Sequence, residues 1–134
     1  MVGSGKPETS RKKVVMVCED EEELLDLYAK VLEIKYTVIR VASGIECITK
    51  YLEQKSKGSP IDLLFLDYKL GDMYGDSVAK KIKELNGVKI ILISAYNLDE
   101  SLKTDLVKNR YIEKFIQKPI KMRQIIDEAI LAIC

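Results

Sequence analysis

We predict that the chain adopts an α/β fold in which one parallel sheet lies between two layers of helices. Its 134 residues, 47% of them hydrophobic, suffice for a single domain that buries its own core. Short apolar runs alternate with helix-length segments over most of the sequence, and the connections between them are short. Such alternation favours right-handed crossovers, which make the strands parallel and place helices on both faces of the sheet. The expected order is therefore (βα)5, with no internal repeat, linker or second domain.

The expected strands differ in polarity, which predicts their places in the sheet. They are Val14–Cys18, Tyr36–Val41, Ile61–Leu66, Lys89–Ile93 and Lys114–Gln117. The first, third and fourth are nearly continuous apolar runs, as expected of strands that are covered on both faces. The second and fifth are more polar, which favours positions at the two edges of the sheet.

The helix-length segments carry apolar residues at spacings of three, four and seven, which is typical of helices with one buried face. They are Glu21–Glu33, Ser43–Lys55, Asp76–Leu85, Asp99–Lys108 and Met122–Ile133. Ser43 suits the N-cap of the second helix, and Asn86-Gly87 suits the end of the third. The fourth segment has the weakest pattern, because only Leu98, Leu102 and Leu106 repeat at helical spacing.

Charge and composition exclude several classes of protein. The 22 Lys and Arg residues nearly balance 21 Asp and Glu residues, and a net charge of +1 argues against a nucleic-acid partner. The chain has no histidine, which excludes histidine-based nucleophile pairs, imidazole metal ligands and imidazole acid–base catalysis. Any chemistry must therefore use carboxylates, lysines, hydroxyls, thiols or a bound ion.

Cysteine spacing and hydropathy predict a cytoplasmic protein that does not associate with membranes. Cys18, Cys47 and Cys134 form neither a zinc motif nor a disulfide framework, so we expect reduced thiols, with Cys18 buried. No run reaches the roughly 18 apolar residues that a membrane span needs, and the N-terminus does not read as a signal peptide. Residues 1–12 are rich in small, polar and basic residues, and we expect them to form a flexible tail in solvent.

Polar side chains follow four of the five expected strands, where a parallel sheet binds its ligands. They are Glu19 and Asp20 after the first strand, Asp67 after the third, Ser94 after the fourth and Lys118-Pro119 after the fifth. Each has an ordinary alternative, because acids favour helix N-termini, aspartates form turns, serines cap helices and prolines end strands. Their coincidence at one edge of one sheet favours a functional site.

The chemistry of this predicted cluster points to phosphoryl transfer. Three carboxylates held close together repel one another, so the cluster needs compensating positive charge. Lys118 supplies one charge, and an all-oxygen ligand set of this kind is typical of Mg²⁺. A carboxylate beside Mg²⁺ can attack a phosphoryl group while Lys118 and Ser94 bind the phosphoryl oxygens. The residues therefore predict a Mg²⁺-dependent phosphoryl acceptor.

Over residues 13–134 the sequence resembles the receiver domain of response regulators, the phosphoacceptor module of two-component signalling. The matching segments are VCEDEEELL with Glu19-Asp20, LLFLDYKLGDMYGD with Asp67 and Gly75, ILISA with Ser94, and FIQKPI with Phe115 and Lys118-Pro119. The resemblance implies a flavodoxin-like three-layer sandwich with a parallel sheet of strand order 2-1-3-4-5.

The resemblance also implies a role for each residue of the site. The phosphoacceptor is Asp67, and the Mg²⁺ ligands are Glu19, Asp20, Asp67 and the backbone carbonyl of Lys69. The phosphoryl-stabilising residues are Ser94 and Lys118, the switch residues are Ser94 and Phe115, and the cis-proline is Pro119.

Several positions matter because they depart from the family pattern or vary within it. The acidic pair is Glu-Asp where Asp-Asp is commoner, and Gly71 replaces the usual proline, which is expected to loosen the loop after Asp67. Lys69 and Tyr96 occupy the two positions that tune phosphoryl loss in the family, and a bulky Tyr96 is expected to hinder the attacking water. Asn109-Arg110 replaces the small residues that usually precede the last strand.

We therefore expect a stand-alone, chemotaxis-regulator-like receiver that takes its phosphoryl group from a histidine kinase or phosphotransfer protein. It is not expected to be an enzyme beyond catalysing its own phosphorylation and dephosphorylation. Output is expected through a separate protein or a homodimer, on the surface of the fourth helix, fifth strand and last helix. The alternative is a pseudo-receiver that binds proteins without phosphorylation, whereas the acids after the first strand argue against a flavodoxin-like cofactor binder.

Overall fold

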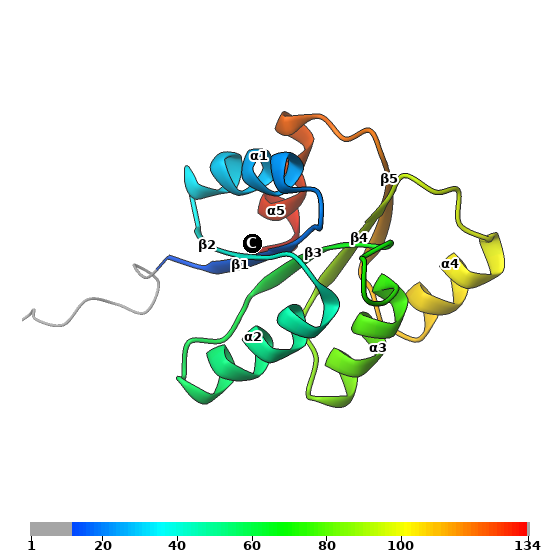
Figure 1. The fold of residues 1–134 in the computed structure, drawn as a ribbon, viewed down its shortest axis with the longest axis horizontal. Coiled ribbons are helices and arrows are strands. Elements are labelled where there is room, and N and C mark those ends of the chain that lie inside the picture. The colour runs from blue at the N-terminus through cyan, green and yellow to red at the C-terminus, as the bar shows by residue number, and fades with distance from the viewer. Residues whose placement is uncertain (1–11, 134) are drawn as a thin grey trace, which may run out of the picture.

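The computed structural model describes residues 12–133, whose parallel strands form one sheet in the order β2-β1-β3-β4-β5 (Figure 1). The strands are β1 (Val14–Cys18), β2 (Thr37–Val41), β3 (Leu63–Asp67), β4 (Ile90–Ser94) and β5 (Lys114–Gln117). The helices are α1 (Glu22–Glu33), α2 (Gly44–Ser56), α3 (Gly75–Glu84), α4 (Glu100–Lys108) and α5 (Met122–Ile133). The predicted (βα)5 order and the implied strand order are confirmed. The predicted tail lies outside the described residues except for Lys12.

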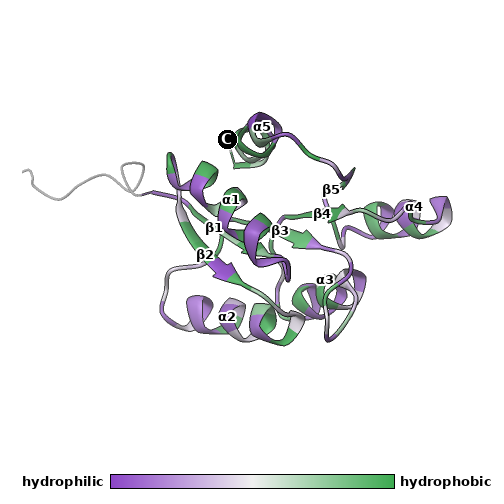
Figure 2. Ribbon diagram, turned by 45° about the horizontal axis from the view of Figure 1, so that its top comes forward, coloured by the Kyte–Doolittle hydropathy of each residue, from purple (hydrophilic) through white to green (hydrophobic). Residues whose placement is uncertain are grey.

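The helices cover both faces of the sheet and make the fold a three-layer sandwich. α1 and α5 lie on one face, and α2, α3 and α4 lie on the other (Figure 1). Successive residues of a strand point to opposite faces, so Val15 and Val17 pack toward α1 and α5, whereas Met16 and Cys18 pack toward the other helices. Figure 2 shows both hydrophilic and hydrophobic residues along each helix, as expected where one side of a helix is buried.

The polarity of each strand matches its place in the sheet. All residues of β1, β3 and β4 are buried, and these are the three inner strands. β2 and β5 each keep exposed residues and form the two edges. Cys18 is buried as predicted, and Ser43 caps α2 by accepting a hydrogen bond from the Glu46 N–H at 3.1 Å. Within residues 12–133, no helix combines the length and the apolar character needed to cross a membrane.

Two strand ends differ from the prediction in a way that matters for the site. β3 was expected to end at Leu66 and β4 at Ile93, but Asp67 and Ser94 are the last residues of these strands. The parallel ladder pairs Asp67 with Ile93 and Ser94 with Gln117. Main-chain pairing does not depend on side-chain polarity, which is why the apolar pattern ended one residue too early. Both side chains are therefore held by the sheet itself.

Candidate functional site

The ends of β1 and β3 bring three carboxylates together. Glu19 follows β1 directly, and its backbone N–H donates to the carbonyl of Val41 at 3.1 Å, which holds it at the end of the sheet. Glu19 is 2% exposed and Asp67 is 7% exposed, whereas Asp20 faces solvent. One carboxylate oxygen from each of these three residues lies within 4.8 Å of the others. The acidic cluster expected from the sequence is thus formed.

Lys118 reaches into this cluster from the end of β5. Its ammonium group donates to Glu19 Oε1 at 2.8 Å and forms an ion pair with Asp67 Oδ1 at 3.1 Å. Its backbone N–H donates to the carbonyl of Ser94 at 2.8 Å, and the Lys118–Pro119 peptide bond is cis. One ammonium therefore bridges two carboxylates, and it supplies the single compensating charge that the sequence predicts.

Burial and mutual repulsion set the protonation of these groups. Burial raises the pKa of Asp67 to about 6, and the charge of Glu19 acts in the same direction, although Lys118 opposes both. Burial also raises the pKa of Glu19 above its ordinary value. For Lys118, burial acts to lower the pKa, but the hydrogen bond to Glu19 and the charge of Asp67 outweigh it and raise the pKa. The single ammonium does not fully compensate the buried negative charge.

Ser94 and Phe115 lie on neighbouring strands, where Ser94 ends β4 and Phe115 pairs with Leu92, two residues earlier on that strand. Ser94 is fully buried, and its Oγ accepts a hydrogen bond from the Tyr96 N–H at 2.8 Å. Since the oxygen accepts this bond, the hydroxyl can still donate its own hydrogen. Phe115 is half-buried against the core beneath α2, α3 and α4, and the Lys103 ammonium lies 5.1 Å from its ring centroid.

A cavity of about 340 Å³ opens over the carboxylates. Its walls include Glu19, Asp67 and Lys118 on the inner side, and Lys69 and Tyr96 nearer the solvent. The Lys69 ammonium donates to the Tyr96 hydroxyl at 3.0 Å and lies 5.2 Å from the centroid of that ring. Sequence reasoning singled out both positions but did not predict that they touch, because they are 27 residues apart.

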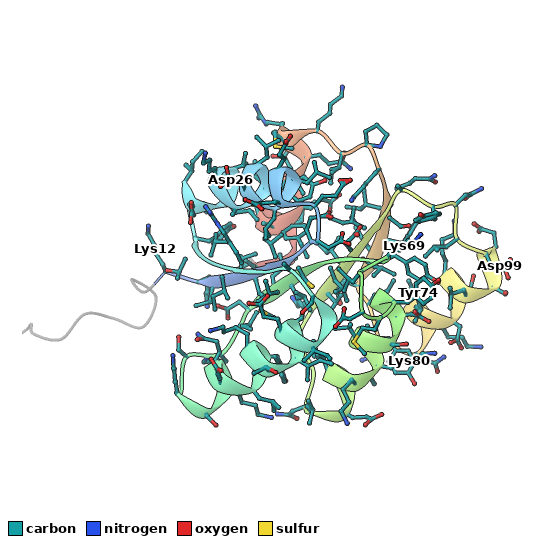
Figure 3. The ribbon with its side chains drawn as sticks, viewed as in Figure 1. Lys12, Asp26, Lys69, Tyr74, Lys80 and Asp99 are labelled. Carbon is teal, nitrogen blue, oxygen red and sulfur yellow. The ribbon has the colours of Figure 1, made fainter. Side chains whose placement is uncertain are left out.

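The loop between β3 and α3 follows Asp67, and α3 must begin with a glycine after it. A Cβ atom on Gly75 would lie 2.6 Å from the Asp67 carbonyl oxygen and 2.9 Å from the Tyr68 Cα. The loop folds back on itself through a bridge between Lys69 and Tyr74, both labelled in Figure 3. Sequence reasoning missed Asp72 in this loop, whose carboxylate binds the start of α2; its partners are 27 and 28 residues away, so no local pattern could reveal them.

The donor set fits a hard divalent cation. Three carboxylates face one another with one ammonium between two of them, so the cluster keeps an excess of negative charge when all three are ionised. All of its potential ligands are oxygen atoms, which Mg²⁺ prefers, and exposed Asp20 leaves the cluster open to water. Glu19, Asp20 and Asp67 would hold such an ion, and Lys69 lines the same cavity.

The fold and this constellation define a receiver domain. Residues 15–130 match the model of the response regulator receiver domain, and the chain belongs to this family. It is 32% identical over 120 residues to hybrid signal transduction histidine kinase L of Dictyostelium discoideum; the match covers 83% of this chain and 7% of that protein. The chain is therefore a receiver domain of two-component signalling, a family that in general binds Mg²⁺ and interacts with histidine kinases and phosphotransfer proteins.

Solved structures share the same fold. A CheY-like response regulator receiver domain protein from Methanospirillum hungatei JF-1 has a TM-score of 0.78 at 24% identity, covering 90% of this chain and 93% of that chain. The CheX-CheY-BeF3-Mg²⁺ complex from Borrelia burgdorferi has a TM-score of 0.81 at 22% identity, covering 92% and 91%. The response regulator TrrA from Thermotoga maritima, in complex with Mg²⁺-BeF, has a TM-score of 0.72 at 24% identity, covering 90% and 98%.

Proposed function

We propose that this receiver accepts a phosphoryl group on Asp67 from the phosphohistidine of a histidine kinase or a phosphotransfer protein. The observation that carries the proposal is the Asp67 carboxylate itself, held by Lys118 at 3.1 Å within 4.8 Å of the Glu19 and Asp20 oxygens. Family membership supports it, as do the similar structures of the CheX-CheY-BeF3-Mg²⁺ complex and of TrrA in complex with Mg²⁺-BeF.

Each side chain has a distinct part in this reaction. The ionised Asp67 carboxylate attacks phosphorus, an O–P bond forms, and the N–P bond breaks with its electron pair leaving on the histidine nitrogen. With a pKa of about 6, Asp67 is mostly ionised at neutral pH and can attack. Lys118 neutralises charge on the phosphoryl oxygens, and the Ser94 hydroxyl donates to another. Bound Mg²⁺, on Glu19, Asp20, Asp67 and the Lys69 carbonyl, would supply further positive charge at these oxygens.

Output is proposed to run through Ser94 and Phe115. A phosphoryl oxygen that draws the Ser94 hydroxyl away from the Tyr96 N–H would open space beside β5 and let the Phe115 ring turn inward. The surface of α4, β5 and α5 would then bind a separate output protein or a second copy of the chain. The domain catalyses only its own phosphorylation and dephosphorylation and is otherwise not an enzyme. The cytoplasmic location expected from the sequence stays a prediction.

Incubation with acetyl phosphate and Mg²⁺, followed by mass spectrometry of the intact protein, tests the proposal. The wild type is expected to gain the mass of one phosphoryl group, and Asp67→Asn is expected to gain none. Asp127→Asn, which changes an exposed aspartate on α5, serves as the control and should behave as wild type. A wild type without any mass gain would contradict the proposal and favour a protein-binding pseudo-receiver.

A further inference from the structure

The loop that leaves the Asp67 end of β3 is tied to a different helix through one carboxylate. Asp72 Oδ1 accepts a hydrogen bond from the Gly44 N–H at 2.8 Å, and Oδ2 accepts one from the Ile45 N–H at 2.9 Å. Both amides belong to the first turn of α2, where the helix dipole also favours a negative charge. These bonds hold the pKa of Asp72 below its ordinary value, so the carboxylate stays charged. Figure 1 shows the start of α2 beside the connection from β3 to α3.

A second contact between the same two segments is independent of charge. A Cβ atom on Gly44 would collide with the side chain of Met73, so the absence of a side chain at residue 44 lets Met73 lie against the helix start. Gly71 shows the opposite, because a Cβ atom there would meet no atom within 4 Å. The loop is therefore anchored at Asp72 and Met73. Gly71, which stands where the family usually has proline, has no neighbouring atoms around its Cβ position.

Backbone contacts within the loop connect its anchored tip to Lys69 at the carboxylate site. The Leu70 N–H donates to the Met73 carbonyl at 3.3 Å, and Lys69 forms a bridge with Tyr74, so the loop closes as a tight hairpin with Asp72 at its tip. Lys69 stands at the base of this hairpin, two residues after Asp67 and on the wall of the cavity. Fixing the tip against α2 thus restricts where the Lys69 backbone can lie relative to Asp67.

We propose that Asp72 is a positioning residue for the cation site, acting through this clasp, defined as Asp72 and Met73 against Gly44 and Ile45. The inference rests on the proposed function, because it assigns the clasp to the loop that carries the Lys69 carbonyl toward Mg²⁺. Loss of a residue that hydrogen-bonds directly to a metal ligand typically weakens metal affinity by about 10- to 100-fold, and Asp72 acts less directly, through the loop. Asp72→Ala is expected to fall near the lower end of this range, because Glu19, Asp20 and Asp67 remain.

The test compares Mg²⁺ affinity among three purified proteins by isothermal titration calorimetry: wild type, Asp72→Ala and Glu46→Ala. Glu46 is the matched control, because it is an acid in the first turn of α2 whose Oε1 accepts a hydrogen bond at 2.8 Å from the N–H of Ala42, a residue outside the loop. The clasp predicts that Asp72→Ala raises the Kd for Mg²⁺ about tenfold, whereas Glu46→Ala leaves it unchanged. Asp72→Asn, which keeps one acceptor oxygen, should fall between them and stands in if Asp72→Ala does not fold.

Each outcome decides the matter. An unchanged Kd in both Asp72 variants would overturn the clasp, whatever the change in melting temperature, and would leave Asp72 only the role of capping α2. A wild type that binds no Mg²⁺ would overturn it as well. A wild type that binds Mg²⁺ more tightly than Asp72→Ala but gains no mass from acetyl phosphate would support the clasp while refuting the phosphoacceptor role. Phosphorylation of Asp72→Ala that is reduced at low Mg²⁺ and complete at high Mg²⁺ would support both the clasp and the phosphoacceptor role of Asp67.

Discussion

Asp67 is expected to destabilise the fold in the absence of metal, so that Asp67→Asn makes the domain more stable at neutral pH. The carboxylate is 7% exposed and lies beside Glu19, and its pKa in the folded chain is about 6 against an ordinary value of 3.8. The folded state therefore disfavours the charged form that prevails at pH 7. Asparagine has nearly the same shape as the protonated acid and carries no charge, so it removes this conflict.

The size of the effect follows from the difference in pKa. Since one pKa unit corresponds to 1.36 kcal/mol, the ionisation of Asp67 costs about 3 kcal/mol of folding free energy at pH 7. Because the pKa of Asp67 is raised in the folded state, protonation of Asp67 stabilises the fold. This stabilisation is fully present below the unfolded pKa and is lost as the pH rises through 6. Asp67→Asn should therefore gain up to about 3 kcal/mol at pH 7 and close to nothing at pH 4. For a domain of this size, that gain amounts to a rise in Tm of roughly 11 °C.

The assay is urea unfolding followed by circular dichroism, in EDTA, at several pH values between 4 and 7. Comparing variants at each pH cancels the titration of the other carboxylates, and Asp127→Asn controls for the loss of any aspartate charge. Surface changes of that kind usually stay within about 0.5 kcal/mol. A gain for Asp67→Asn that does not change with pH, or a loss of stability at pH 7, would refute the reasoning that burial and Glu19 oppose the ionised form.

Three further predictions follow from the same geometry. Mg²⁺ at about 100 times its Kd should stabilise the wild type by about 2.7 kcal/mol, measured as a rise in Tm, and exposed Asp20→Asn should lose most of this response while keeping the metal-free Tm. Gly75→Ala should cost about 2 kcal/mol or more in urea unfolding because its Cβ meets the Asp67 carbonyl, whereas Gly71→Ala should be nearly neutral; equal effects would contradict the close packing at Gly75. Tyr96→Ala, which removes the hydroxyl that Lys69 contacts over the cavity, should shorten the lifetime of the acyl phosphate, measured by its decay after gel filtration; an unchanged lifetime would contradict a shielding role.

Local patterns in the sequence were enough to predict the architecture but not the contacts between distant segments. The apolar runs correctly placed β1, β3 and β4 inside the sheet, because a strand that is covered on both faces consists almost entirely of apolar residues. The strand ends correctly placed Lys118 beside the carboxylates, but they did not predict that its one ammonium would contact both Glu19 and Asp67, because that depends on side-chain geometry. The same holds for Asp72, whose partners Gly44 and Ile45 lie on another helix and whose loop shows no periodicity.

The distribution of buried polar groups explains why the site depends on its partners. Among residues 12–133, the buried polar side chains other than tyrosine and cysteine are Glu19, Asp67 and Ser94, and all three lie at the carboxyl end of the sheet. Lys118 contacts both carboxylates, and an anionic phosphoryl group cannot approach them until the remaining negative charge is compensated. In the proposed reaction the donor histidine belongs to another protein, because the 134 residues contain no histidine, and it would reach the cavity past Lys69 and Tyr96. A near-neutral net charge thus coexists with a locally acidic site, which under the proposed function would need both a cation and an outside donor to react.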